Sequence, residues 1–176
     1  MNAIVPVSIE ADKTKFTLLL KAGANDVAHW IAAAQGAAQE RGLTAKDEFH
    51  ITVIGFKTGK ALSELYAHRS PTEQARIVQA LYDMAKAISW QAAPLDGGLL
   101  YIEKEYSFRN NKKEKRSSII QLLEMPGMQE FYTRLNAAIG TDFALPPPHI
   151  TLFTGNGTGI GIDSLADLQE LKPQQI

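Results

Sequence analysis

Two periodicities alternate along this chain. Short runs rich in β-branched, aromatic and leucine side chains are typical of strands, whereas apolar residues three or four apart predict amphipathic helices. Strands are expected at residues 15–21, 48–56, 89–94, 99–108, 117–124 and 144–154. Helices are expected at residues 27–41, 61–68, 72–88 and 126–139. Strands and helices are interspersed over the whole length, which is typical of an α+β domain.

Turn residues separate these expected elements. Gly42 ends the first helix, and Pro71 divides the next helical region, because proline cannot continue a helix but can begin one. Asp96-Gly97-Gly98 is a strong signal for a tight turn. Loops are expected at residues 57–60 and at the charged stretch 109–116, so the strands on either side of the second loop form a hairpin.

The expected elements fall into two halves of similar plan, each with strands, a helix and one strand that contains His-Ile-Thr. This order predicts a single bilobal α+β domain. Its two pseudo-symmetric lobes would be mostly antiparallel sheet with outer helices, facing each other across a central cleft. Lobe one would cover about residues 14–88 and lobe two about 89–154. A C-terminal tail would follow at 155–176, beginning with a glycine-rich segment expected to be a flexible loop.

The repeated tripeptide is the most informative motif. His50-Ile51-Thr52 stands in the first half and His149-Ile150-Thr151 in the second, and the chain holds only four histidines. Because side chains alternate between the two faces of a strand, each histidine shares a face with its threonine while the isoleucine points the other way. The two polar faces could therefore line one cleft, with the apolar faces packed against helices.

Composition narrows the possible functions. The 176 residues carry a net charge of −1, so no overall basic field would attract long duplex nucleic acid. Cysteine is absent, which excludes disulfides, thiolate nucleophiles and cysteine metal sites. The first residues lack the basic start and long apolar run of a signal peptide, and no stretch is long enough to span a bilayer. We therefore expect no membrane association and a cytoplasmic location.

Two imidazoles, each with a neighbouring hydroxyl, fit phosphodiester chemistry that needs no metal. One histidine takes a proton from the attacking group and the other protonates the leaving oxygen. The hydroxyls can donate hydrogen bonds to the phosphate oxygens where negative charge develops. No cofactor is expected, because zinc would need a third protein ligand and no cluster of His, Asp or Glu stands at ligand spacing.

The motifs HITV at 50–53 and HITL at 149–152 resemble those of the two-histidine phosphoesterase superfamily, which includes 2′,5′-RNA ligase-like proteins and cyclic nucleotide phosphodiesterases. The resemblance implies the bilobal α+β fold. It makes His50 and His149 the catalytic pair, and Thr52 and Thr151 the phosphate-binding hydroxyls. The implied substrates are 2′-linked or 2′,3′-cyclic phosphodiesters of nucleotides or RNA ends.

The chain departs from that family at two points. An arginine often follows the second motif in RNA ligase-like members, where this chain has Phe153-Thr154-Gly155. Phe-Leu-Gly often follows the first motif, where this chain has Ile54-Gly55-Phe56. A cation that neutralises phosphate must therefore come from elsewhere in the sequence.

Further substrate contacts are expected from the charged loop and from the residue after the first motif. Arg109 in the loop, and Lys57, could contact phosphates, while Tyr106 or Phe108 could stack on a nucleobase. A solvated hairpin tip is the alternative interpretation of the loop. Two alternatives to an enzyme also stay open. One is a non-catalytic module that binds a nucleotide or RNA end in the same cleft, and the other is an unrelated α+β domain with two coincidental strands.

Overall fold

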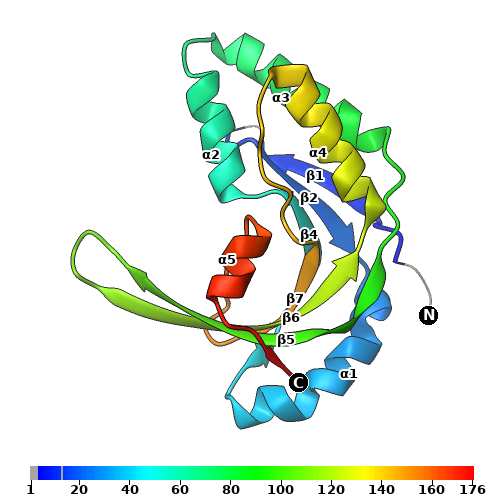
Figure 1. Cartoon of the computed structure of the whole chain (residues 1–176), viewed down its shortest axis with the longest axis vertical. Helices are drawn as coiled ribbons and strands as arrows, with labels where there is room; N and C mark the ends of the chain where they lie inside the picture. Colours follow the sequence, from blue (N-terminus) through cyan, green and yellow to red (C-terminus); the bar gives the residue numbers. More distant parts are fainter. Residues whose placement is uncertain (1–3, 13) are drawn as a thin grey trace.

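The computed structural model describes residues 4–12 and 14–176, which form one mixed α+β structure around a single antiparallel sheet (Figure 1). The strands are β1 (Ser8–Asp12), β2 (Thr17–Ala22), β3 (Thr44–Ala45), β4 (Phe49–Ile54), β5 (Ala93–Ser107), β6 (Lys113–Glu124), β7 (His149–Thr154) and β8 (Gln174–Gln175). The helices are α1 (Ala24–Glu40), α2 (Phe56–Leu65), α3 (Pro71–Lys86), α4 (Pro126–Ile139) and α5 (Leu165–Glu170). The prediction of an α+β fold is confirmed.

The two strands that carry His-Ile-Thr are neighbours in the middle of the sheet. The strand order is β1-β2-β4-β7-β6-β5-β8, and β3 pairs with β7 beside this path. β1, β2 and β4 come from the first half of the chain, and β7, β6 and β5 come from the second half. The halves therefore meet where β4 pairs with β7, through Ile51 and Ile150.

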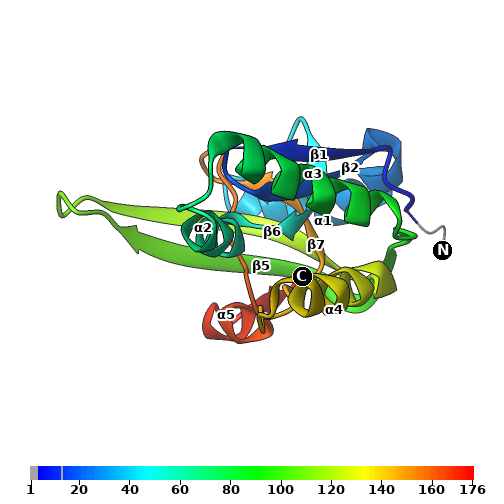
Figure 2. The same cartoon turned by 90° about the horizontal axis from the view of Figure 1, so that it is seen from above.

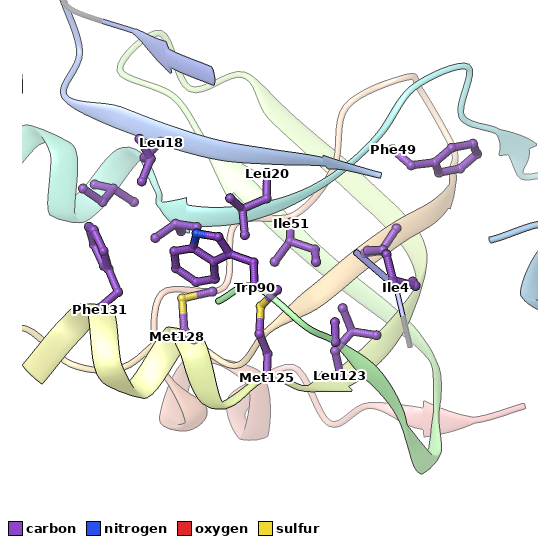
Figure 3. Packing of buried hydrophobic residues seen from close by; sticks show 14 of the residues in the cluster. Ile4, Leu18, Leu20, Phe49, Ile51, Trp90, Leu123, Met125, Met128 and Phe131 are labelled. Carbon is purple, nitrogen blue, oxygen red and sulfur yellow. The ribbon is translucent and has the colours of Figure 1, made fainter. Parts of the chain in front are cut away.

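The main core contains the apolar face of these central strands. Ile51, Val53, Ile150 and Leu152 are fully buried, as the alternation of the two motifs predicts. Figure 3 shows Ile51 beside Leu20 of β2, with Trp90 and the α4 residues Met128 and Phe131 packed on the same cluster. The further core residues shown there are Ile4, Leu18, Phe49, Leu123 and Met125. This packing fixes the direction of the polar residues between the isoleucines.

The strands β5 and β6 form a long hairpin whose tip extends well beyond the rest of the molecule (Figures 1 and 2). Their pairing runs from Ala93↔Glu124 out to Ser107↔Lys113. The expectation of a loop over the whole of 109–116 is therefore wrong, because β6 begins at Lys113. The positive φ of Asn111, 59°, marks the tight turn at the tip, a conformation that asparagine tolerates better than most residues.

A second, smaller core lies under the C-terminal segment. Ile160, Ile162 and Leu168 pack on three residues of the hairpin base, Leu100, Ile102 and Ile120. The interpretation of the glycine-rich segment as a flexible loop is wrong at its C-terminal end, because these isoleucines fix it against the sheet. The tail then adds β8 to the edge of β5.

Two local predictions differ from the structure. Residues 57–60, expected as a loop, belong to α2, which begins at Phe56. The turn expected at Asp96–Gly98 lies within β5, where the pairing with β6 shifts between Pro94 and Leu99. There the Gln121 side chain donates a hydrogen bond to the Leu95 carbonyl, so the strand bulges instead of reversing. Of the described helices, none is long and apolar enough to cross a membrane.

Candidate active site

One pocket gathers the four polar residues of the two motifs. His50 and Thr52 of β4 and His149 and Thr151 of β7 line a cavity of about 220 Å³. All four side chains are partly exposed, whereas the isoleucines between them are fully buried. The structure thus places the two histidines and the two threonines, predicted from separate halves of the sequence, around one space.

The pairing of β4 with β7 explains this arrangement. Ile51 faces Ile150 in an antiparallel pair, so the same register sets His50 across from Thr151 and Thr52 across from His149. Residues directly opposite in such a pair lie on the same face of the sheet. A local two-fold relation therefore brings each histidine next to the threonine of the other motif.

His149 is held in one tautomer. Its Nδ1 lies 2.8 Å from the carbonyl oxygen of Pro147. A carbonyl can only accept a hydrogen bond, so Nδ1 must carry the proton and donate it. Nε2 is then the nitrogen that can exchange a proton with a ligand. Burial lowers the pKa of this imidazole, while the Pro147 carbonyl and the Asp163 carboxylate act to raise it.

His50 has different electrostatic surroundings. Burial lowers its pKa most, and the positive charges of Lys21 and Lys46 lower it further, whereas Glu48 acts in the opposite direction. Lys21 is bound to Glu48, with 2.7 Å between Nζ and Oε2. Lys46 has no carboxylate partner among the residues that the structure describes; its Nζ lies 3.5 Å from the Gly157 carbonyl oxygen. Lys46 does not line the pocket, so its effect on His50 is that of a nearby positive charge.

The C-terminal segment supplies one wall of the pocket. Gly159, Ile160, Gly161, Ile162 and Asp163 all line it. Gly159 lies so close to the motif that a Cβ there would be 3.5 Å from the Thr151 hydroxyl oxygen. Burial raises the pKa of the Asp163 carboxyl group, and the charge of Lys57 partly offsets this effect. Asp163 is the one carboxylate among the lining residues, and it lies near enough to His149 to favour its protonated form.

The start of α2 forms another part of the wall, beside Asp163 of the C-terminal segment. Gly55, Phe56 and Thr58 line the pocket, and Gly55 caps the helix without a side-chain hydrogen bond. The first backbone N–H groups of a helix attract anions, and here the Asp163 carboxylate lies at this end of α2, where the Lys57 backbone N–H favours its charged form. The Phe56 side chain is 76% exposed at the pocket, where an aromatic ring would suit a nucleobase.

Tyr132 of α4 also lines the pocket. Its hydroxyl donates a hydrogen bond of 2.8 Å to the Val53 carbonyl. Burial raises the pKa of Tyr132 to about 12. The phenol therefore stays neutral at physiological pH and acts here as a fixed structural donor.

The other expected substrate contacts lie outside this pocket. The Lys57 Nζ points to Asp167, at 3.8 Å, and Lys57 lines a neighbouring hollow. Tyr106, Phe108 and Arg109 lie on the projecting hairpin. The structure therefore joins the two motifs but does not bring these four residues to them.

Sequence reasoning missed Lys46, Phe56 and Asp163. No local signal marks Asp163, because it reaches the pocket only through the packing of a distant segment. Lys46 stands four residues before His50 and acts on it by its charge, without lining the pocket. Phe56 stands two residues after the end of β4, and its nearness to the first motif was the available signal.

No group of three or more His, Asp or Glu suited to a metal ion occurs within the described ranges 4–12 and 14–176. Comparisons of the chain with models of protein families, with curated proteins and with solved structures found no match. The residues of the pocket and their geometry therefore carry the functional assignment.

Proposed function

We propose that this chain is a metal-independent phosphodiesterase of the two-histidine type. Its substrates are 2′,3′-cyclic or 2′-linked phosphodiesters of nucleotides or RNA ends. The observation that carries this proposal is the position of His50, Thr52, His149 and Thr151 around one cavity. A pocket that only bound nucleotides would have no need for two groups able to transfer protons near neutral pH.

The surroundings of the two histidines assign their roles. His50, beside the charges of Lys21 and Lys46, favours the neutral form that a general base requires. Burial lowers the pKa of His149 as well, but the Pro147 carbonyl and the Asp163 carboxylate act in the opposite direction, so of the two we assign His149 as the general acid. His50 therefore removes a proton from water as the water oxygen attacks phosphorus. His149 delivers the proton of Nε2 to the leaving ribose oxygen as the P–O bond breaks, so the proton count balances.

Two kinds of group in this chain can stabilise the negative charge of the phosphate. The Thr52 and Thr151 hydroxyls donate hydrogen bonds to the non-bridging oxygens, where negative charge grows in the transition state. Lys46 does not line the cavity, but its charge acts on His50, so it is the candidate to replace the arginine that follows the second motif in RNA ligase-like proteins.

A substrate panel in EDTA tests the proposal. Wild type and the His50→Ala variant are incubated with 2′,3′-cyclic mononucleotides, 2′,5′-linked dinucleotides and 3′,5′-linked dinucleotides, and the products are separated by chromatography. The proposal requires EDTA-resistant turnover of a cyclic or 2′-linked substrate by wild type alone. Tight binding of these compounds without turnover would instead identify a non-catalytic binding module.

A further inference from the structure

The β5–β6 hairpin concentrates positive charge in a chain that is slightly negative overall. Residues 103–116 hold six Lys or Arg and three Glu, whereas the whole chain has a net charge of −1. The remainder of the molecule is therefore net negative. A basic segment on an otherwise acidic protein is typical of a surface that attracts nucleic acid electrostatically.

The charges differ between the two faces of the hairpin. On one face, Lys113 binds Glu105 at 2.9 Å and Lys115 binds Glu103 at 2.8 Å, so the charges there cancel. This face continues to Tyr101 at the hairpin base. There it meets α1, whose last turn is followed by Arg41, with its guanidinium 4.7 Å from the centre of the Tyr101 ring.

The other face has an excess of cations. Lys104 is paired across the hairpin with Arg116, and Tyr106 with Glu114, so these four residues share one face. Arg116 binds Glu114 at 2.6 Å, which leaves Lys104 without a salt bridge in the described structure. The guanidinium of Arg116 also lies over the ring of Tyr106, 4.4 Å from its centre, in a cation–π contact.

This cationic face is the face that carries the pocket. Ile120 of β6 is paired with Thr151 of β7, and also with Leu100 of β5, so these residues and Lys104 lie on the same side of the sheet. From Ile120 to Glu114 is six residues along the strand, or about 20 Å. A single nucleotide held at the histidines could not reach that far.

The tip of the hairpin extends the same surface. Phe108, Arg109, Asn110 and Lys112 border a hollow together with Glu114, a residue of the cationic face. Phe108 is 42% exposed, and within the described residues neither Arg109 nor Lys112 forms a salt bridge. An open aromatic ring beside two free cations is the combination that binds single-stranded nucleic acid, by stacking on a base and contact with the backbone.

We propose that the cationic face of the hairpin binds the single-stranded RNA segment that precedes the reactive end, so that the substrate is an RNA oligonucleotide and not a mononucleotide. Phe108 stacks on a base, and Arg109 and Lys112 contact backbone phosphates. This inference rests on the proposed function for the choice of RNA end, but the binding surface is separate from the catalytic pocket.

Charge-matched variants test the surface. Arg109→Gln/Lys112→Gln removes two positive charges from the tip, and Lys113→Gln/Lys115→Gln removes two from the opposite face. Both are made in a His50→Ala/His149→Ala background, so that the probe is not consumed. Binding of a fluorescein-labelled single-stranded RNA decamer with a terminal 2′,3′-cyclic phosphate is followed by anisotropy at several salt concentrations. Both variants lose two positive charges, so both should weaken the long-range attraction of RNA to the same extent. A difference in RNA affinity between them therefore reports direct contact at the tip.

The proposal requires Arg109→Gln/Lys112→Gln to weaken RNA binding roughly tenfold more than its control, and to reduce the slope of log K against log salt by about 1.4. Phe108→Ala should weaken binding roughly tenfold as well. All three sets of changes, placed in the otherwise wild-type chain, should leave turnover of cyclic mononucleotides unchanged. Equal weakening by the two charge variants, or a decamer that binds no tighter than a dinucleotide, would overturn the inference.

The two proposals fail in different ways. In one case, wild type turns over cyclic mononucleotides but the hairpin variants bind RNA equally well. This result would support the proposed phosphodiesterase activity and contradict the proposed RNA-binding role of the hairpin. In the other case, the variants differ in RNA affinity as expected but no cyclic substrate is turned over. This result would support RNA binding by the hairpin and contradict the proposed phosphodiesterase activity.

Discussion

Ile51 and Ile150 face each other in the antiparallel pairing of β4 with β7, and both are fully buried. This pair is the centre of the local symmetry of the site. Because the two isoleucines point into the core, the residues on either side of each must point to the opposite face, where the pocket lies. The arrangement of the candidate catalytic groups thus depends on the packing of two apolar side chains that never touch the substrate.

The first prediction concerns the threonines. Thr52→Val and Thr151→Val keep the shape of the side chain but remove the hydroxyl donor, so each should lower kcat/KM roughly 10²- to 10³-fold. Thr→Ser at the same positions keeps the donor and should retain most of the activity. Steady-state kinetics on a 2′,3′-cyclic nucleotide, with thermal unfolding as a check of folding, distinguishes the two. Equal losses for Val and Ser would contradict the role of the hydroxyls.

The second prediction concerns Lys46. Its charge lowers the pKa of His50, so Lys46→Gln should let that pKa rise. A general base must be deprotonated, so the acid limb of the kcat/KM profile should move to higher pH, with activity lost below neutrality. Lys86→Gln, at the end of α3, is the charge-matched control and should leave the profile in place. If the acid limb of the Lys46→Gln profile stays where it is in wild type, the charge of Lys46 does not act on His50.

The third prediction concerns Asp163, whose replacement should shift the pH profile in the direction opposite to that expected for Lys46→Gln. Its carboxylate acts to raise the pKa of His149, so Asp163→Asn should lower that pKa. A general acid must be protonated, so the basic limb of the kcat/KM profile should move to lower pH while the acid limb stays. If Asp163→Asn moved the acid limb instead, the roles assigned to His50 and His149 would be reversed.

The sequence was most informative where local pattern and final environment agree. The helix expected at residues 126–139 has these bounds as α4, and Ser70-Pro71 begins α3 with the Ser70 hydroxyl accepting from the Glu73 N–H at 3.3 Å. The alternation within each His-Ile-Thr strand also predicted which side chains are buried. These features depend on neighbours within a few residues, which the sequence displays directly.

The missed features depend on distant partners. Nothing near Gly55 marks the start of α2, because the helix has no side-chain cap, and Gly59 suggested a loop. The structure places Gly59 against the Lys15 carbonyl, a contact that no local pattern encodes. Asp163 likewise comes to the pocket through the packing of Ile160 and Ile162 on the hairpin base. The sequence therefore indicated the reacting groups but not the walls around them.

The fourth prediction tests that helix contact. A Cβ on Gly59 would lie 2.5 Å from the Lys15 carbonyl oxygen, so Gly59→Ala should lower the free energy of unfolding by about 1–3 kcal/mol. Gly36 lies inside α1 with nothing within 4 Å of an added Cβ, so Gly36→Ala should raise it by about 0.4–1 kcal/mol. Urea unfolding measures both. A Gly59→Ala variant as stable as wild type would mean that α2 packs less closely on the start of β2.

The central claim is that His50 and His149 contact one phosphate. The chain has two other histidines as internal controls, His29 and His68, which are exposed and lie outside the pocket. NMR of the ¹⁵N-labelled histidines during titration with a nucleoside 2′-monophosphate tests the claim directly. The His→Ala variants assign each signal to its residue. If both histidines contact the phosphate, the ring signals of His50 and His149 should shift with a single dissociation constant while those of His29 and His68 stay in place. Shifts of only one of the pair, or of neither at saturating nucleotide, would contradict it.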